Sequence, residues 1–514
     1  MISAQVSLLD TNNILMNARV NGDIGKEYDS SNLFYAASKA PYNASTTFLW
    51  SSSLWMGGIE GEANLHLAGN TYSQNGDDFW YGPVASGYDT VYDATYNRTW
   101  IITNSQIESH ITNYAEPNYV LPEVIENWPT HGNIDNGEAQ NLAPFKDVNN
   151  NGEYEPMLGD HPIIRGDKAV FVIYNDDRLA NVSTNANKIG VEVHLMMYGY
   201  DSNDEDLDNA IFMNYRIFNR GDLNLSDFKI GKFVDWDLGH YNDDYVGCDV
   251  DRNLSFVYNG DATDEGTYGY GDNPPAAGLV LLNESMDAHI SFQNGTHPTL
   301  GFPVIPTGYY NYLSGKYLYG TDYLVDTIVS TYMFPGTTDP SMPSLDLDEN
   351  YFNNNPSDRR SVQATHHGSF DIGASICLDY AFVFANDVTN TNLENLDFLK
   401  ERVDSIQDFY DSHFEGCLDY IVDIENLDLE DFIAATGLDC SYLESSNGWK
   451  LSLLDAENYN VQVQLTNVQG QLIRKLNWQT TEDLILQKNG IENGVYFVTV
   501  LKGGTSYSTQ IVFK

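Results

Sequence analysis

Basic residues are scarce in this sequence. Its 514 residues include 25 Lys and Arg but 73 Asp and Glu, so the formal net charge is −48 at pH 7. A nucleic-acid-binding protein needs a basic patch to neutralise phosphates, and an anionic membrane repels so acidic a chain. We therefore expect no nucleic-acid partner. The same acidity keeps a secreted protein soluble and attracts divalent cations wherever carboxylates cluster.

Long apolar runs are missing as well. No run reaches the roughly 18 consecutive apolar residues that indicate a membrane-spanning helix, so we expect a protein that does not span the membrane. The opening residues MISAQ include small residues and end in Ala-Gln, which resembles the end of a signal peptide. We interpret residues 1–5 as a signal-peptide remnant.

Cysteine is rare, and its spacing matches no known motif. Cys248, Cys377, Cys417 and Cys440 lie far apart and form no C-x-x-C pair. This spacing excludes zinc-ribbon, thioredoxin-like and haem-attachment sites. The even count permits disulfides in an oxidising compartment, with Cys417 and Cys440 the nearest pair in the sequence. Four buried free thiols are the alternative.

Common catalytic motifs are absent too. The sequence contains no H-E-x-x-H, no G-x-S-x-G and no P-loop. His366 and His367, with Asp358 nearby, raise the question of a metal site, but adjacent residues on a strand face opposite ways. We expect Arg359 or Arg360 to pair with one of the many carboxylates instead.

Aromatic side chains are plentiful, with 35 Tyr, 23 Phe and 8 Trp. Together with frequent Asn and Thr, they favour strands and turns, so the predicted fold class is mostly β. Residues 210–219 alternate between two sets of large side chains and predict a strand in a sheet that is covered on both faces. Apolar residues at three- and four-residue steps in 395–414 predict one long helix packed on a sheet. They are Leu396, Leu399, Val403, Ile406 and Tyr410.

The chain divides into four predicted parts. After residues 1–5, residues 6–420 are expected to form a large multi-sheet, β-sandwich-like region with a few helices. A boundary between two subdomains near residue 165 is left open. Residues 421–446 are interpreted as an acidic linker. Residues 447–514 read as short strands separated by Asn-Gly, Gln-Gly and Gly-Gly turns, which is typical of a small immunoglobulin-like β-sandwich.

The C-terminal segment carries the most specific motif. The stretches NVQGQLIRKL at 467–476 and NGVYFVTVLKGGTSYSTQIVFK at 493–514 resemble the type A sorting domain of the type IX secretion system. The resemblance implies export through a partner, the type IX secretion machinery, to the outer surface of a Gram-negative bacterium or beyond it. The matching residues are Gly494, Val495, Tyr496, Phe497, Gly503, Thr509, Ile511, Val512 and Lys514.

Residues 6–420 also resemble a family, that of large uncharacterised secreted proteins that carry the same sorting domain. The phrases NWPTHGNIDNGEAQNLAPFKDVNNNGEYEPMLGDHP at 127–162 and NPSDRRSVQATHHGSF at 355–370 are among those that carry the resemblance. It implies kinship over most of the chain but no reaction.

The segment DVNNNGEYEPMLGD at 147–160 resembles a calcium loop that lacks its last ligand. Calcium takes six to eight oxygens from carboxylates, amides and carbonyls. Leu158 stands where the chelating carboxylate belongs, and Gly159 would allow Asp160 to replace it. The alternative is a loop of Asx turns that binds no ion. The predicted ligands are Asp147, Asn149, Asn151, the carbonyl of Glu153, and Asp160.

A second acidic cluster lies in VDWDLGHYNDDYVGCDVD at 234–251. Asp235 and Asp237 alternate on a predicted strand, so their side chains point the same way. Three readings stay open for the cluster: solvated or turn-capping carboxylates, a structural metal site, and an acid–base pair for glycoside hydrolysis. The metal reading involves Asp235, Asp237, Asp243, Asp244 and Asp249.

Aromatic residues near the N-terminus raise one more possibility. Trp50, Trp55, Tyr72, Phe79, Trp80 and Tyr81 would suit a sugar-stacking platform, but aromatic residues on alternating strands more often fill a core.

Taken together, these features predict a secreted, non-catalytic structural or adhesive protein of the outer cell surface that holds structural Ca²⁺. We expect a homo-oligomer or polymer, such as the subunit of a filament. The alternative is a calcium-dependent polysaccharide-binding or glycoside-hydrolysing protein that uses the 235–251 cluster and has a glycan as its partner. A third possibility is cargo bound to export machinery.

Overall fold

A computed structural model describes the following residues: 6–25, 37–38, 46–61, 63–72, 76–149, 151–325, 327–336, 338, 355–414, 438–443, 448–453, 460–467, 472–479, 484–488, 491, 494–502 and 505–513. The predicted signal-peptide remnant, residues 1–5, lies outside them. The chain divides into two compact units, which are described separately. The first comprises Met1–Ser109, Pro122–Ala143 and Ile164–Asp419, and the second comprises His110–Leu121, Pro144–Ile163 and Tyr420–Lys514.

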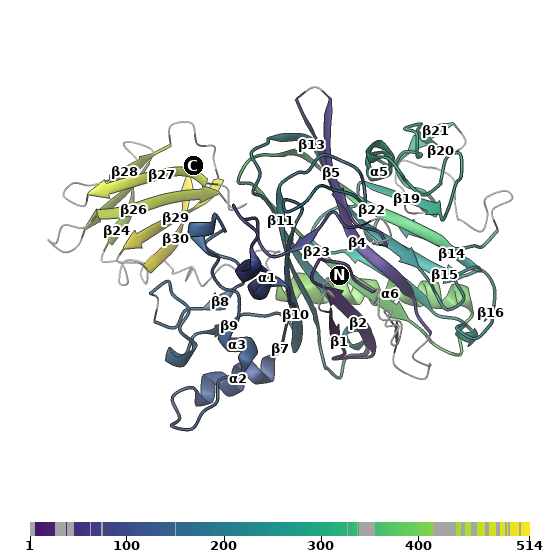
Figure 1. Cartoon of the computed structure of the whole chain (residues 1–514), viewed down its shortest axis with the longest axis horizontal. Coiled ribbons are helices and arrows are strands. Elements are labelled where there is room, and N and C mark those ends of the chain that lie inside the picture. The colour runs from purple at the N-terminus through teal and green to yellow at the C-terminus, as the bar shows by residue number, and fades with distance from the viewer. Residues whose placement is uncertain are drawn as a thin grey trace. The chain divides into compact units, whose positions relative to one another are not determined.

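A nine-stranded antiparallel sheet is the largest element of the first unit (Figure 1). In order across the sheet it contains β14 (Asp244–Asp249), β15 (Leu254–Asn259), β18 (Ala276–Leu281), β23 (Ser375–Ala385), β12 (Ala210–Asn219), β11 (Val191–Gly199), β10 (Lys168–Asn175) and β6 (Trp80–Tyr81). The ninth strand, β7 (Trp100–Thr103), also pairs with β10. Strand β12 alternates as predicted: Ile211 and Met213 enter the main core, while Phe212 is buried on the other face.

A five-stranded sheet packs against the nine-stranded one. In order it contains β19 (Ala288–Gln293), β22 (Arg359–Phe370), β13 (Leu225–Trp236), β4 (Leu49–Glu60) and β5 (Asn64–Gly69). Both sheets contribute to a single hydrophobic core. Trp236 of β13, for example, meets Phe382 of β23 edge-on at 6.2 Å. The predicted mostly-β, sandwich-like architecture is therefore confirmed.

One charged side chain lies inside this sandwich. Lys232 of β13 is completely buried, and its Nζ donates to the hydroxyl of Tyr215 on β12 at 2.6 Å. Burial lowers the pKa of Lys232 to about 7, because the charged form loses its hydration, and the carboxylate of Asp23 opposes that shift.

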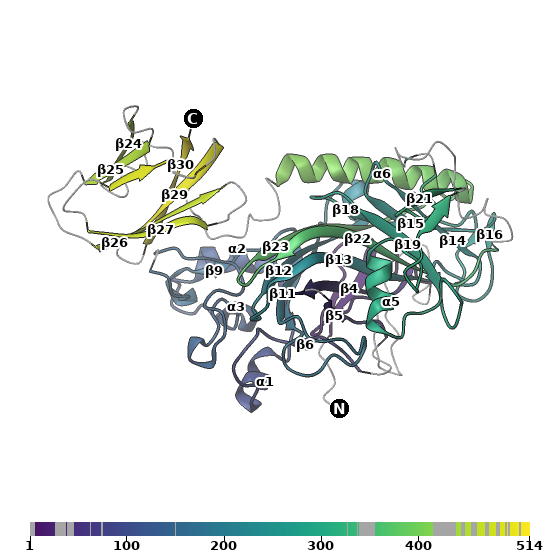
Figure 2. The same ribbon diagram turned by 90° about the horizontal axis from the view of Figure 1, so that it is seen from above.

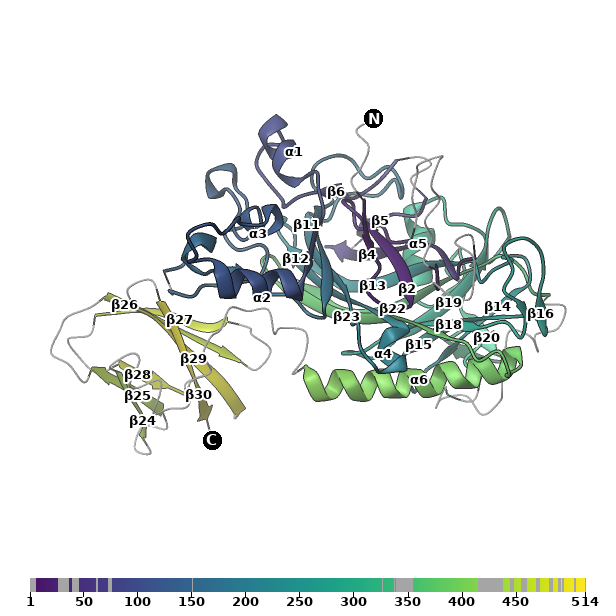
Figure 3. The same cartoon turned by 90° about the horizontal axis from the view of Figure 1, so that it is seen from below.

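The predicted long helix is α6 (Asn392–His413). It begins at a capping box in which Thr391 and Glu394 satisfy each other's backbone N–H groups. Its buried stripe includes Leu399 and Ile406, and it packs on β15, β18 and β23 (Figures 2 and 3). No described helix is long and apolar enough to cross a membrane.

The outer face of the five-stranded sheet is covered by α5 (Pro306–Leu313), which contacts all of its strands. Trp55 of β4 stacks on Phe233 of β13 at 4.9 Å, and Tyr309 of α5 meets Trp55 edge-on at 4.7 Å. No residue of α5 is among the described residues that line the cleft of the candidate site on this face.

Shorter elements complete the first unit and part of the second. The helices are α1 (Thr90–Tyr96), α2 (Asn104–Asn113), α3 (Glu123–Glu126) and α4 (Glu205–Asp208), with 3-10 turns at Ile134–Asn136 and Pro156–Leu158. The strands are β1 (Val6–Leu9), β2 (Ile14–Arg19), β3 (Ala37–Ser38), β8 (Phe145–Lys146), β9 (His161–Pro162), β16 (Thr263–Asp264), β17 (Gly271–Asp272), β20 (Tyr323–Val325) and β21 (Ile328–Ser330).

The C-terminal residues of the second unit form two antiparallel sheets around one core. One sheet contains β24 (Leu438–Leu443), β25 (Gly448–Leu453) and β28 (Leu484–Gln487); the other contains β27 (Leu472–Gln479), β26 (Asn460–Asn467), β29 (Gly494–Lys502) and β30 (Thr505–Phe513). Strand β24 lies inside the interval interpreted as an acidic linker, and most of that interval lies outside the described residues. The immunoglobulin-like assignment stays a prediction.

The structure describes one free cysteine and one disulfide-bonded cysteine, so the alternative of four free thiols is wrong. Cys248 on β14 is free and buried, whereas Cys377 on β23 is disulfide-bonded. The chain therefore combines a buried thiol with an oxidised cysteine.

A buried carboxylate joins α6 to the nine-stranded sheet. Asp379 of β23 accepts from Nη1 of Arg165 at 3.1 and 3.2 Å and from the Tyr410 hydroxyl at 2.6 Å. Asn214 of the adjacent strand adds a third donor at 2.8 Å. Arg165 and Asp379 are both almost fully buried, so each depends on the other for charge compensation.

Replacing Asp379 by Ala is expected to lower the free energy of unfolding by about 3–5 kcal/mol, because it leaves the Arg165 charge buried without its partner. Urea titrations measure the loss. Asp397→Ala is the matched control on α6, since Asp397 is exposed and lies 4.0 Å from Lys400, and it should cost less than about 1 kcal/mol. Equal losses in the two variants would show that the buried pair does not hold α6.

Candidate functional site

A cluster of four charged residues lies on the outer face of the five-stranded sheet: Asp235, Asp237, Asp358 and Arg360. Asp235 of β13 lies directly opposite Arg360 of β22. Side chains two residues apart on a strand share a face, so Asp237 and Asp358 lie next to this pair. One oxygen from each of the three carboxylates lies within 4.8 Å of the others. Among the described residues, no other group of three His, Cys, Asp or Glu side chains is this close.

Arg360 connects two of the three carboxylates of this cluster. Its Nη2 contacts both oxygens of Asp235, at 3.1 and 3.3 Å, and its Nη1 lies 2.6 Å from Asp358. Its Nε donates to the hydroxyl of Tyr72 at 2.6 Å. All three guanidinium nitrogens are therefore engaged, and the predicted pairing of Arg359 or Arg360 with a carboxylate is realised by Arg360.

Asp237 has a different electrostatic environment from Asp235. Burial raises the pKa of Asp237 well above its usual range, and the neighbouring carboxylates of Asp235 and Asp358 raise it further. The more distant attraction of Arg360 only partly offsets this. A bound cation would stabilise the ionised form of Asp237, so a proton and a cation compete for the same carboxylate.

This cluster of four charged residues lines a cleft of about 440 Å³. Aromatic rings and one amide supply the rest of its wall: Trp50, Tyr72, Tyr241 and Asn294. Tyr241 is 44% exposed, so one ring of the wall faces solvent. A cleft of this size with aromatic faces and a few polar groups is typical of a small-ligand site.

The rest of the predicted acidic cluster lies elsewhere. Asp244 is fully buried and accepts from the backbone N–H of Leu238 at 3.1 Å, while Asp249 pairs with Arg252 at 3.0 Å. Asp243 lies 3.4 Å from His240. These three carboxylates serve local turns and pairs, and of the carboxylates predicted in this segment only those of Asp235 and Asp237 line the cleft.

The loop 147–160 belongs to the second unit and is built from successive side-chain-to-backbone bonds. The backbone N–H of Gly152 donates to Oδ2 of Asp147 at 2.6 Å, and φ of Gly152 is +83°, which favours glycine. The side-chain oxygens of Asn149 and Asn151 accept from the N–H groups two residues later. This is the Asx-turn arrangement. The other Asp147 oxygen is buried without a hydrogen-bond partner, which favours a cation.

The side chain of Asp160 connects the two ends of the loop by accepting hydrogen bonds from backbone N–H groups. It is fully buried and accepts from the N–H groups of Val148 at 2.8 Å and Glu155 at 2.6 Å. The side chain of Glu155, which the sequence pattern did not single out, accepts from the Asn151 amide at 2.5 Å. Among the predicted ligands Glu153 is exposed, and its backbone N–H donates to Asn151.

The adjacent histidines contact different groups, as the strand geometry predicted. His366 Nε2 bonds the backbone carbonyl of Leu313 at 2.8 Å, whereas His367 Nε2 lies 3.7 Å from Glu284. They do not share a site.

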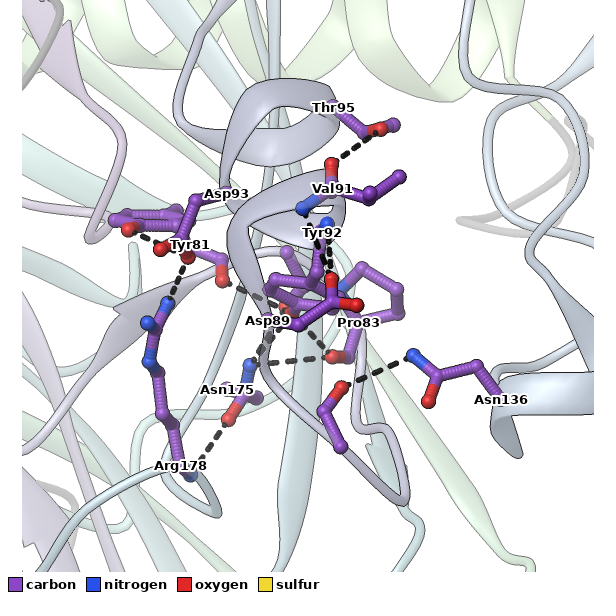
Figure 4. A network of polar contacts seen from close by, with 12 residues as sticks. Tyr81, Pro83, Asp89, Val91, Tyr92, Asp93, Thr95, Asn136, Asn175 and Arg178 are labelled. Atoms are coloured by element: carbon purple, nitrogen blue, oxygen red, sulfur yellow. Dashed lines mark hydrogen bonds and ion pairs between the residues drawn. The ribbon is translucent and has the colours of Figure 1, made fainter.

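The aromatic residues near the N-terminus do not form one platform. Trp55 and Phe79 lie in the core, while Trp50 and Tyr72 line the cleft. Tyr81 donates to Asp93, and Arg178 joins the same carboxylate at 2.6 Å (Figure 4). The guanidinium of Arg178 also lies 5.7 Å from the ring centre of Trp80. This network holds α1, whose N-terminus is capped by Asp89 (Figure 4).

Comparisons with known proteins identify the C-terminal part of the chain. Residues 448–514 match the secretion system C-terminal sorting domain, so the predicted sorting domain is confirmed. The resemblance of residues 6–420 to a secreted family stays a prediction. A search of curated proteins finds no match.

Among solved structures, one similar to this chain is a polysaccharide lyase, at 8% identity and a TM-score of 0.19. The alignment covers 62% of this chain and about a third, 33%, of that structure. At this score the likeness carries no argument about fold or function.

Stability without divalent cations is expected to fall as pH rises from about 5 to about 7, because the buried carboxyl groups with raised pKa values outnumber His289 and His367, whose pKa values are lowered to about 4 and which act in the opposite direction. Above about pH 7, Lys232, whose pKa burial lowers to about 7, opposes the fall. Burial raises the pKa of Asp23 to about 7 and those of Asp78 and Asp264 to about 6, in addition to the shift at Asp237. Between the unfolded and folded pKa values the folded chain binds more protons, so it loses stability as pH rises through the folded values.

Thermal melting across this pH range measures the effect. Calcium at about 10 mM should raise the melting temperature at about pH 8 more than at about pH 5, because higher pH favours the ionised form of the carboxyl groups that would bind the ion. Asp237→Asn should remove most of that calcium effect, and Asp397→Asn should keep it. A melting temperature that rises with pH in the absence of calcium would show that the buried carboxyl groups do not have raised pKa values.

The loop 147–160 makes a separate prediction. In an Asp237→Asn background, which silences the cleft, calorimetry should detect calcium binding in the millimolar range, on the order of 1 mM. Asp147→Asn should abolish that binding, since it removes the negative charge of the carboxylate whose second oxygen has no hydrogen-bond partner. If the loop binds no calcium in either protein, it is a turn without an ion.

Proposed function

We propose that this protein is a secreted adhesin of the cell surface that binds a neutral glycan in the Asp235–Asp237–Asp358 cleft with the help of calcium. The observation that carries the proposal is the meeting of three carboxylates and three aromatic residues in one open cleft. The proposed activity is binding, without catalysis.

The carboxylates suit a calcium ion that is shared with a ligand. Calcium takes six to eight oxygens, and the three carboxylates each offer one oxygen within 4.8 Å of the others. The open side of the cleft leaves room for two hydroxyls of a sugar to complete the shell. The predicted calcium role of Asp235 and Asp237 is thus retained, with Asp358 in place of Asp243, Asp244 and Asp249.

The aromatic wall and the overall charge indicate the class of glycan. Trp50, Tyr72 and Tyr241 can pack against the apolar faces of sugar rings. A formal charge of −48 repels anionic polymers. All three guanidinium nitrogens of Arg360 already have partners, so Arg360 is not available to pair with an acidic group of a ligand. These features support a neutral sugar with adjacent hydroxyls.

The sorting domain supports the location. A C-terminal sorting domain at 448–514 implies export by a dedicated secretion system and an interaction with its machinery. We place the mature protein on the outer surface of a Gram-negative bacterium or in the surrounding medium. Assembly into a homo-oligomer or filament stays a prediction, which light scattering at millimolar calcium would refute if it found only monomers.

Binding to immobilised cellulose, xylan, mannan and laminarin tests the proposal. At least one glycan should bind in calcium and be released by EDTA. Asp358→Asn and Trp50→Ala should each weaken binding by roughly tenfold or more, about 1.4 kcal/mol, because they remove a cation ligand and a stacking face. Asp397→Asn should bind like the wild type. Binding that survives both EDTA and Asp358→Asn would contradict the proposed site.

Hydrolysis of the glycan is a second candidate function. It is favoured by the different electrostatic environments of the Asp235 and Asp237 carboxylates. Arg360 stabilises the ionised form of Asp235, whereas burial and its neighbours raise the pKa of Asp237. Such a contrast is the signature of an acid–base pair. Release of reducing ends from the same glycans, lost in Asp237→Asn, would establish hydrolysis; its absence in the wild type would exclude it for those glycans.

A further inference from the structure

A second cavity adjoins the cleft across the ring of Tyr72. It measures about 210 Å³, and Tyr72 lines both spaces. The hydroxyl of Tyr72 accepts from Arg360 at the cleft, while its ring stacks on Phe302 at 5.6 Å on the side of the second cavity. One buried side chain is thus the common wall of the two spaces.

The second cavity differs from the cleft in chemistry. None of the described residues in its wall is charged, and most of them are apolar or aromatic: Tyr72, Val182, Phe302, Pro303, Val304 and Tyr309. Val304 is 73% exposed and Val182 is 41% exposed, so two apolar side chains stand open to solvent beside it. Isolated exposed valines are ordinary, but two at the mouth of one cavity favour a ligand that covers them.

The wall of this cavity is held in place from behind. Asp78 is fully buried and accepts from the N–H of Ser183 at 2.8 Å and from the Thr184 hydroxyl at 2.6 Å. Tyr309 is fixed by its contact with Trp55 in the core. The shape of the cavity is therefore set by the fold, as expected for a binding pocket.

We infer that the glycan continues from the cleft past Tyr72 into the second cavity, so that the ligand is an oligosaccharide of at least two units whose second unit presents an apolar face or substituent. This inference rests on the proposed function. The carboxylate cleft holds a sugar through its hydroxyls and calcium. The apolar cavity holds the next unit through a C–H face, a methyl or an acetyl group, and contributes affinity through buried area.

A chain-length series tests the inference. The probes are the oligosaccharides of one to four units from cellulose, xylan, mannan and laminarin, measured by calorimetry in calcium. For the glycan that binds, the dissociation constant should fall by about tenfold or more between one unit and two or three, about 1.4 kcal/mol. Val304→Asp should remove this gain by placing a charge at the mouth of the cavity, yet leave the affinity for one unit unchanged. Val388→Asp is the matched control, because Val388 is 59% exposed and does not line either cavity, and it should keep the gain.

The outcomes separate this inference from the proposed function. If one unit binds in a calcium-dependent way but longer chains bind no better, the inference fails and the proposed cleft stands. If Val304→Asp keeps the full gain, or weakens one unit and three units equally, the inference also fails. If nothing binds at any length while the variants stay folded, the proposed function fails for these glycans and this inference fails with it.

Discussion

The candidate site depends on one cross-strand register, which places Asp235 of β13 opposite Arg360 of β22. That register sets the positions of Asp237 and Asp358 as well, because each lies two residues away on the same face. A slip of β13 by one residue would turn Asp235 and Asp237 to the other face and separate them from Arg360 and Asp358. Both strands are internal to the sheet, with β22 between β19 and β13 and with β13 between β22 and β4. The site is therefore supported on both sides by paired strands.

The packing behind this sheet explains how the site can tolerate so many carboxylates. Trp236, between Asp235 and Asp237 in the chain, points into the core and meets Phe382, so the same stretch of β13 anchors the two sheets and presents the acids. Repulsion among the carboxylates is opposed by Arg360 and by the apolar contacts beneath them. The same short stretch of chain therefore stabilises the packing of the two sheets and supplies two carboxylates of the candidate site.

Composition and regular patterns in the sequence were enough to predict the mostly-β class, the alternating strand β12 and the helix α6, and a family resemblance predicted the sorting domain. The shared face of Asp235 and Asp237 was also predictable, since it needs only the two-residue period of a strand. Asp358 and Arg360 were not, because their proximity arises from the pairing of β13 with β22 across more than a hundred residues. Lys232 shows the same limit: its charge favours solvent, but the alternation of β13 turns it into the sandwich, where the hydroxyl of Tyr215 accepts a hydrogen bond from it.

The engagement of Arg360 with Asp235, Asp358 and Tyr72 has a consequence for ion selectivity. Two carboxylates are held in place before anything enters the cleft, so an incoming ion must fit their spacing, which is fixed by the separation of two strands. Calcium accepts irregular shells and long bonds, whereas magnesium demands a compact octahedron and gives up its water reluctantly. A rigid array cannot contract around the smaller ion. If the cleft binds a cation, as proposed, the strand spacing therefore favours calcium over magnesium.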